Sequence, residues 1–188
     1  MRADSSIRMH YQDVVMLIKP NFGDHWFAIK EHEAWRLHWD VRVHIGGESL
    51  LSWFLRESPH LDPARPQPAT WSGYHKSKYL FSERIIIGHG AGPTVLFDNG
   101  LCRVRGNLTI HTQFDVGHLR LFFMGARLRG NFSMKWTGPG EDDWTLFKED
   151  DKYADPRRKF PHALTPEMIL ELGSKKRPKK DPHQMLLL

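Results

Sequence analysis

The stretch from Leu37 to Val43 alternates strictly between apolar and polar side chains. Strict alternation is typical of a half-buried β-strand, because successive side chains of a strand point to opposite faces of its sheet. The pattern therefore predicts a strand with one face in the core, and it places His38, Asp40 and Arg42 side by side on the other face. A further histidine, His32, stands six residues upstream of His38.

Short apolar segments separated by glycine and proline continue along the chain. Gly46-Gly47 predicts a hairpin turn, Asp98-Asn99-Gly100 is expected to end a strand, and His32 is expected in a loop. We expect strands at residues 26–29, 37–44, 49–55, 84–87, 94–97, 107–111, 118–124, 126–136 and 144–148. This pattern predicts a mainly β protein, a compact antiparallel β-barrel with few short helices.

Helical signals are confined to residues 165–172, with Thr165 placed to cap the helix and Gly173 to end it. The net charge is +5, and much of the excess lies between Lys175 and Lys180. Such a basic segment either tethers a protein to nucleic acid or only keeps it in solution, and we expect it to be disordered. The expected organisation is an N-terminal segment (1–24), the barrel domain (25–155), and a short helix with the basic tail (156–188).

The composition limits where the protein acts. No apolar run approaches the length needed to span a bilayer, and the first residues lack the pattern of a secretory signal. The lone cysteine, Cys102, excludes an intramolecular disulfide and fits a reducing compartment. We therefore expect a cytoplasmic protein without a membrane partner.

His32, His38 and Asp40 are residue types that bind metal. Neutral imidazoles and a carboxylate bind borderline divalent ions such as manganese and zinc, and three protein ligands leave positions open for water and substrate. A divalent ion lowers the pKa of bound water from about 15.7 to as low as ~7. The Arg42 guanidinium next to the metal would match two phosphate oxygens. Together these residues predict metal-assisted attack on a phosphate ester, whereas a surface strand with mixed charges is the alternative interpretation.

A second group is formed by residues 75–79, where His75 and Tyr79 flank two lysines. A histidine and a tyrosine four residues apart could meet a phosphoryl group and its leaving oxygen. The same composition is also common in exposed turns. The residues alone leave both interpretations open.

These motifs resemble those of the 3′-phosphoesterase domain of bacterial DNA ligase D, the end-healing module of non-homologous end joining. In that family a histidine is followed by Leu-His-x-Asp-x-Arg, which His32 and residues 37–42 match. His75 and Tyr79 stand at the family's spacing. The resemblance covers about residues 25–154, and it includes Ser52-Trp53, Pro59, 61–63, 90–92, 95–100, 121–130 and 144–151.

The resemblance implies a β-barrel enzyme that uses manganese to trim 3′ ends of DNA or of RNA/DNA. The family removes a terminal 3′-phosphate, and can first remove a terminal ribonucleoside, to leave a 3′-hydroxyl. By motif matching, His32, His38 and Asp40 would bind Mn²⁺, with Zn²⁺ or Co²⁺ as other candidate ions. Arg42 and His75 would contact the phosphate, and Tyr79 would complete the catalytic group.

The short chain leaves no room for polymerase or ligase modules. The resemblance therefore implies a stand-alone protein of the bacterial or archaeal cytoplasm. Its expected partners are separate end-joining ligase and polymerase proteins.

The sequence also departs from the family pattern. Lys30-Glu31 replaces a Gln-Lys pair, and Arg56-Glu57-Ser58-Pro59 replaces Pro-Lys-Gly-Pro, so that Arg56 is the candidate for the lysine's role. Arg8 is the candidate for an active-site arginine of the family's N-terminal segment. Fewer phosphate-binding cations imply weakened or divided activity.

Two alternatives follow from these residues. One is a catalytically weak module that binds DNA ends through the basic tail and aromatic residues. The other is a non-haem iron oxygenase, in which His38 and Asp40 begin a metal triad that a distant histidine completes. His111 and His118 are the candidates for that histidine.

Overall fold

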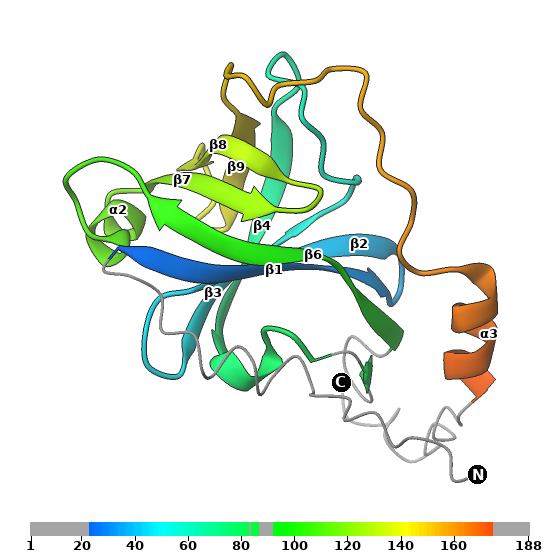
Figure 1. The fold of residues 1–188 in the computed structure, drawn as a ribbon. Helices are drawn as coiled ribbons and strands as arrows, with labels where there is room; N and C mark the ends of the chain where they lie inside the picture. The colour runs from blue at the N-terminus through cyan, green and yellow to red at the C-terminus, as the bar shows by residue number, and fades with distance from the viewer. Residues whose placement is uncertain (1–22, 83, 87–91, 175–188) are drawn as a thin grey trace, which may run out of the picture.

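The structure is a computed structural model that describes residues 23–82, 84–86 and 92–174 (Figure 1). Arg8 and the basic tail lie outside the described residues. The three-part organisation expected from the sequence therefore stays a prediction.

Nine strands in the described part of the chain form one antiparallel sheet. They are β1 (Asp24–Glu33), β2 (Leu37–His44), β3 (Ser49–Leu55), β4 (Gln67–Lys76), β5 (Arg84–Ile86), β6 (Gly92–Val104), β7 (His118–Gly125), β8 (Arg129–Trp136) and β9 (Asp143–Lys148). Their order is β1-β2-β3-β4-β9-β8-β7-β6-β5, and a further pairing of β1 with β6 closes eight of them into a barrel. The predicted mainly β, antiparallel barrel is confirmed.

Two short α-helices and one 3₁₀ turn complete the described elements. Helix α2 (Ile110–Asp115) and helix α3 (Pro166–Ser174) stand on opposite sides of the barrel in Figure 1, and the 3₁₀ turn η1 (Ser77–Tyr79) follows β4. The hydroxyl of Thr165 accepts a hydrogen bond from the backbone N–H of Met168 at 3.2 Å, so the predicted N-cap is confirmed. Gly173 lies inside α3 instead of ending it. No described helix is long and apolar enough to span a membrane.

The core follows from the alternation of the strands. Phe27, Trp53 and Phe123 point into the barrel and are completely or almost completely buried. A second, small apolar cluster lies on the outer face of the sheet, where Ala28 and Leu50 pack with Leu80. The outer face of β1, β2 and β3 is therefore covered in part by the segment around η1.

The hairpin of β2 and β3 has the predicted bounds, and Gly46 and Gly47 form its turn with φ angles of +104° and +56°. The turn predicted at residues 98–100 is wrong, because β6 continues through them to Val104. The Asp98 carboxylate is used elsewhere: it accepts the backbone N–H groups of Ala126 and Leu128 and so holds the turn between β7 and β8.

Three further predictions need correction. Residues 107–111 do not form a strand, because the Thr109 hydroxyl caps α2 by accepting the N–H of Thr112. The strand predicted from residue 126 begins at Arg129. His32 is not in a loop but on β1, which is longer than predicted. Strand β4 has no counterpart among the predicted strands.

Candidate metal centre

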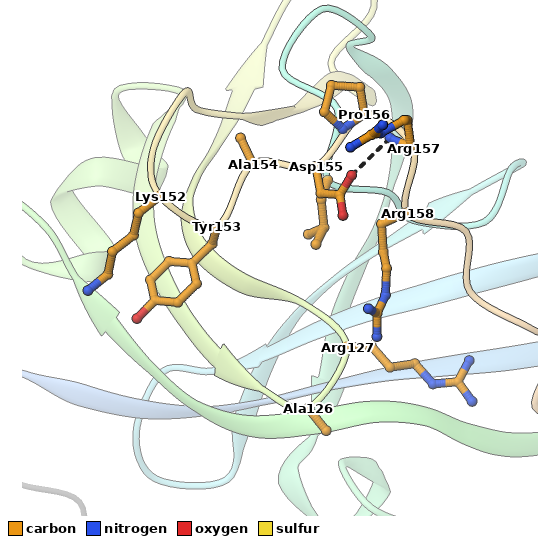
Figure 2. A pocket seen from close by; sticks show the side chains of 10 residues that line it. Ala126, Arg127, Lys152, Tyr153, Ala154, Asp155, Pro156, Arg157 and Arg158 are labelled. Carbon is orange, nitrogen blue, oxygen red and sulfur yellow. Dashed lines mark hydrogen bonds between the residues drawn. The ribbon is translucent and has the colours of Figure 1, made fainter.

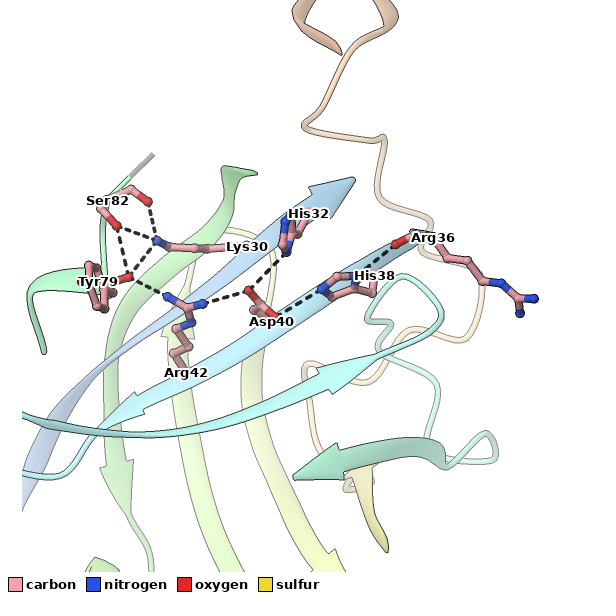
Figure 3. Close-up of polar contacts among 8 residues, drawn as sticks. All are labelled: Lys30, His32, Arg36, His38, Asp40, Arg42, Tyr79 and Ser82. Atoms are coloured by element: carbon pink, nitrogen blue, oxygen red, sulfur yellow. Dashed lines mark hydrogen bonds and ion pairs between the residues drawn. The ribbon is translucent and has the colours of Figure 1, made fainter. Parts of the chain in front are cut away.

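The pairing of β1 with β2 brings the predicted metal ligands together. His32 lies directly opposite His38, and Lys30 lies opposite Asp40. Opposite residues of an antiparallel pair have Cβ atoms about 4.5–5.5 Å apart, and residues two apart on one strand share a face. His32, His38 and Asp40 therefore converge on the outer face of the sheet, as Figure 3 shows. The two imidazole rings have centroids 4.6 Å apart.

Three donor atoms meet at this point. Nδ1 of His32 is 4.0 Å from Oδ2 of Asp40, and Nε2 of His38 is 3.5 Å from Oδ1 of Asp40. One ligand atom from each residue lies within 4.8 Å of the others, and no other such group of three occurs among the described residues. Bonds of about 2.0–2.2 Å to one metal ion separate its ligand atoms by roughly 3.0–3.5 Å. Small side-chain rotations would therefore suffice to bind an ion.

The His38 ring is oriented for this role. Its Nδ1 lies 3.0 Å from the carbonyl oxygen of Arg36, and because a carbonyl only accepts, Nδ1 is the protonated nitrogen. The neutral ring then presents the lone pair of Nε2 toward Asp40. Histidines that bind metal commonly donate their other N–H to a carbonyl in this way. Burial disfavours the charged ring, but the Asp40 carboxylate and the Arg36 carbonyl outweigh burial and raise the pKa of His38.

Asp40 is buried and ionised. Burial alone would raise its pKa, but the contact with His38 and the positive charge of Arg42 outweigh this effect and lower the pKa. Nη2 of Arg42 donates to Oδ2 of Asp40 at 2.9 Å. The carboxylate thus keeps the negative charge that a metal ligand needs.

Arg42 also connects the cluster to η1. Its Nη1 donates to the carbonyl oxygen of Tyr79 at 2.9 Å, so that two of the five N–H donors of its guanidinium bind protein groups. The phosphate-binding role predicted for Arg42 stays a prediction. A phosphate would have to use the remaining N–H groups of the guanidinium, because Nη1 donates to Tyr79 and Nη2 donates to Asp40.

Lys30 is a site residue that the sequence interpretation missed. Its side chain is buried, and Nζ donates to the Tyr79 carbonyl at 2.7 Å and to the Ser82 hydroxyl at 3.2 Å, as well as to the Ser82 carbonyl (Figure 3). Lys30 is two residues from His32 on the same strand, so alternation along β1 was the available signal. Lys30 and Arg42 together fix the backbone of Tyr79.

The neighbouring Glu31 points the other way, toward the core. Its buried carboxylate contacts Nδ1 of His162 at 2.5 Å and accepts the backbone N–H of Ala163 at 2.6 Å. The ring of His162 also packs against Trp39, with centroids 5.8 Å apart. Glu31 thereby ties the segment after β9 to the strand that carries His32.

The remaining predicted residues lie around this cluster. His75 stands near the end of β4, opposite Leu50, and is half-buried. Burial, and then the positive charge of Arg42, lower the pKa of His75. Tyr79 is half-buried in η1. Arg56 is exposed, one residue beyond the end of β3.

The distant histidines of the oxygenase hypothesis do not join the cluster. Nε2 of His111 lies 3.2 Å from the carbonyl oxygen of Ile45, and His118 lines a separate cavity with Lys148 and Glu149. The third member of the described metal-binding group is His32.

Comparison with known proteins identifies the family of this chain. Residues 30–135 match the family described as the DNA ligase D 3′-phosphoesterase domain. The chain is also 30% identical over 129 residues, 66% of its length, to the multifunctional non-homologous end joining protein LigD of Pseudomonas aeruginosa. The match spans 15% of that relative's length. His32, His38, Asp40 and Arg42 all lie within the matched region, and the chain belongs to the DNA ligase D 3′-phosphoesterase domain family.

Proposed function

We propose that this protein is a metal-dependent phosphoesterase that processes DNA 3′ ends during end joining. It removes a 3′-phosphate, a 3′-terminal ribonucleoside, or both, and leaves a 3′-hydroxyl. The observation that carries the proposal is the convergence of His32, His38 and Asp40 beside the guanidinium of Arg42. A metal-binding group next to a fixed cation is suited to a phosphate ester.

The donor set of two imidazole nitrogens and one carboxylate oxygen suits Mn²⁺, and also Zn²⁺ or Co²⁺. When bound, the ion would neutralise phosphate charge and lower the pKa of a water. In the monoesterase reaction, oxygen from water forms a bond to phosphorus, the bond from phosphorus to the 3′-oxygen breaks, and that oxygen takes up a proton.

The surrounding residues have separate tasks in this proposal. Arg42 binds phosphate oxygens with its remaining N–H groups, while its contacts with Asp40 and Tyr79 hold it in place. His75 has a lowered pKa, so at neutral pH its ring is mostly uncharged and contacts the phosphate through a hydrogen bond. Tyr79 is held by Lys30 and Arg42 at the same edge of the site.

The proposal includes a cellular setting. DNA or RNA/DNA 3′ ends are the substrates, and end-joining ligase and polymerase proteins act on the product. We place the protein in the bacterial or archaeal cytoplasm.

A primer–template assay tests this function. A labelled primer that ends in a 3′-phosphate, and one that ends in a single ribonucleotide, are incubated with Mn²⁺ or with chelator. We expect a 3′-hydroxyl product with Mn²⁺ only, loss of product in His38→Ala, and normal product in His44→Ala. His44 is the matched control because it lies on the same strand and, by alternation, on the same face, yet outside the metal-binding group.

The same assay separates the alternatives. DNA binding without any product from either primer would identify an end-binding module and refute the enzymatic proposal. Uptake of oxygen with Fe²⁺ and a 2-oxo acid, without phosphate chemistry, would identify an oxygenase.

A further inference from the structure

A shallow cavity of about 470 Å³ has a lining that shares no residue with the metal-binding cluster (Figure 2). It lies between the turn that joins β7 to β8, the segment that follows β9, and Leu61. Neither the sequence interpretation nor the proposed reaction uses this cavity. Its residues nevertheless form a distinct chemical surface.

The cavity is strongly basic. Four cationic side chains line it, and Asp155 is its one carboxylate: the cations are Arg127, Lys152, Arg157 and Arg158. Oδ1 of Asp155 accepts the backbone N–H of Arg157 at 3.1 Å and so serves the local turn. None of the four cations forms a salt bridge with a carboxylate of the described residues. Like charges gathered without acidic partners create a potential that attracts an anion.

Two of these arginines are held in place by aromatic rings. The guanidinium of Arg127 lies 4.3 Å from the centroid of Phe97 and donates from Nη1 to the Pro161 carbonyl at 2.5 Å. The guanidinium of Arg158 lies 5.8 Å from the centroid of Phe160. The rings of Phe97 and Phe160 contact each other edge to face, at 6.0 Å. Side chains fixed before binding lose less conformational entropy when a ligand arrives.

The chain connects this cavity closely to the metal-binding cluster. Arg158 is four residues from His162, whose ring contacts Glu31, the residue before His32. Four extended residues span at most about 14 Å. One strand of a DNA duplex carries a phosphate about every 3.4 Å along the axis. A duplex whose 3′ end lies at the cluster, and whose axis runs toward the cavity, would bring a phosphate near it after about four to six base pairs.

We propose that this cavity binds a backbone phosphate of the DNA duplex whose 3′ end occupies the metal-binding cluster. The inference rests on the proposed function, because it takes the position of the DNA 3′ end from it. Arg127 and Arg158 provide planar donors for phosphate oxygens, and Arg157 and Lys152 add positive charge. Such a contact anchors the duplex without reading its sequence.

The test measures DNA affinity without catalysis. A fluorescent duplex with a recessed 3′-hydroxyl is titrated with protein in chelator, at several salt concentrations, and anisotropy is recorded. The variant R157Q/R158Q removes two exposed cations from the cavity. The control R120Q/K135Q removes the same charge from the second cavity, where Glu149 is also present. Thermal unfolding verifies that both variants are folded.

We expect R157Q/R158Q to weaken binding about tenfold or more at 50 mM salt and to reduce the slope of log affinity against log salt by about 1–2. The control should change affinity less than threefold and leave the slope unaltered. Equal effects of the two variants, or no measurable duplex binding by the unaltered protein, would overturn the inference.

The DNA-binding test of the cavity and the primer assay of the proposed function can fail independently. If the cavity variant weakens binding but the unaltered protein processes neither primer, the phosphate contact stands and the enzymatic proposal fails. If the unaltered protein processes 3′ ends while both variants bind DNA equally, the enzymatic proposal stands and the phosphate contact fails.

Discussion

Removal of one ring from the metal-binding cluster should remove most of the stabilisation that a metal ion gives to the fold. The substitution is His38→Ala, because His38 combines a donor nitrogen 3.5 Å from Asp40 with a ring oriented by the Arg36 carbonyl. An ion that binds only the folded state stabilises it by RT ln(1 + [L]/Kd). This measurement is independent of any catalytic activity.

The size of the expected Tm shift follows from the ratio of the ion concentration to the Kd. At an Mn²⁺ concentration 100 times the Kd, the stabilisation is about 2.7 kcal/mol. For a chain of this length, 1 kcal/mol shifts the Tm by about 2–4 °C, so the unaltered protein should gain about 5–11 °C. If loss of His38 weakens binding about 100-fold, the stabilisation falls to about 0.4 kcal/mol, or roughly 1–2 °C.

The assay is thermal unfolding with Mn²⁺ and with chelator, and the quantity compared is the difference between the two Tm values of each variant. His44→Ala is the matched control, because His44 lies on β2 as well but its Nε2 contacts the Gly47 carbonyl at 3.0 Å. The control should retain the full shift. A shift above about 5 °C in His38→Ala, or loss of the shift in His44→Ala, would refute the assignment of the site.

Three other substitutions or deletions have defined outcomes. Arg42→Lys should lower kcat/KM for the 3′-phosphate primer at least tenfold. One ammonium cannot replace the two separate hydrogen bonds of Arg42 to Asp40 and Tyr79, of about 1.5–3 kcal/mol each. Equal values of kcat/KM for the two proteins would contradict this. Asp151→Asn should lower the free energy of unfolding, measured in urea at pH 7, by about 3 kcal/mol, because buried Lys148 loses its partner at 2.6 Å. The control Glu57→Gln removes an exposed ion pair and should cost less than about 1 kcal/mol. Burial alone would raise the pKa of Asp151, but the Lys148 ammonium and two backbone N–H groups lower it in the folded state. Its contribution is therefore complete above the unfolded pKa of about 3.9 and disappears as the pH falls through the lower folded value, so the difference between the variants should be constant near neutrality and shrink below about pH 4. Deletion of residues 174–188 should leave the metal-induced Tm shift intact but make the salt dependence of DNA binding shallower, whereas unchanged affinity and slope would identify the tail as solubilising only.

The sequence predicted the part of the site that depends on local alternation. The pattern from Leu37 to Val43 predicted both the bounds of β2 and the shared face of His38 and Asp40, and the structure confirms the bounds. The position of His32 beside His38 depends on the register between β1 and β2, which alternation along one strand cannot predict. A pairing in which His32 lies opposite His38 follows from the short hairpin between β1 and β2, which the sequence interpretation replaced with a loop.

The sequence predictions were wrong where a residue makes a long-range contact that competes with its local structural preference. Asp98 and Gly100 are typical turn residues, yet Asp98 holds a turn 28 residues away, and Gly100 lets β6 approach the backbone of Met124 closely. A Cβ at Gly100 would lie 2.6 Å from the Met124 carbonyl oxygen. The sequence interpretation missed β4 for two reasons. Residues in its second half alternate only between exposed and half-buried positions, and Pro68 is more typical of a loop than of a strand.

The departure Lys30-Glu31 from the family pattern has a structural reason. Because neighbours on a strand face opposite sides, Lys30 reaches outward to Tyr79 and Ser82, while Glu31 reaches inward to His162. Strand β1 thus anchors two segments next to His32. The segment around η1 contacts its outer face, and the segment around His162 contacts Glu31 on its other face. The two residues do not simply remove a phosphate-binding cation from the site. They hold the backbone of Tyr79 and the segment that leads to the basic cavity, and so they support the candidate metal centre from two faces of β1.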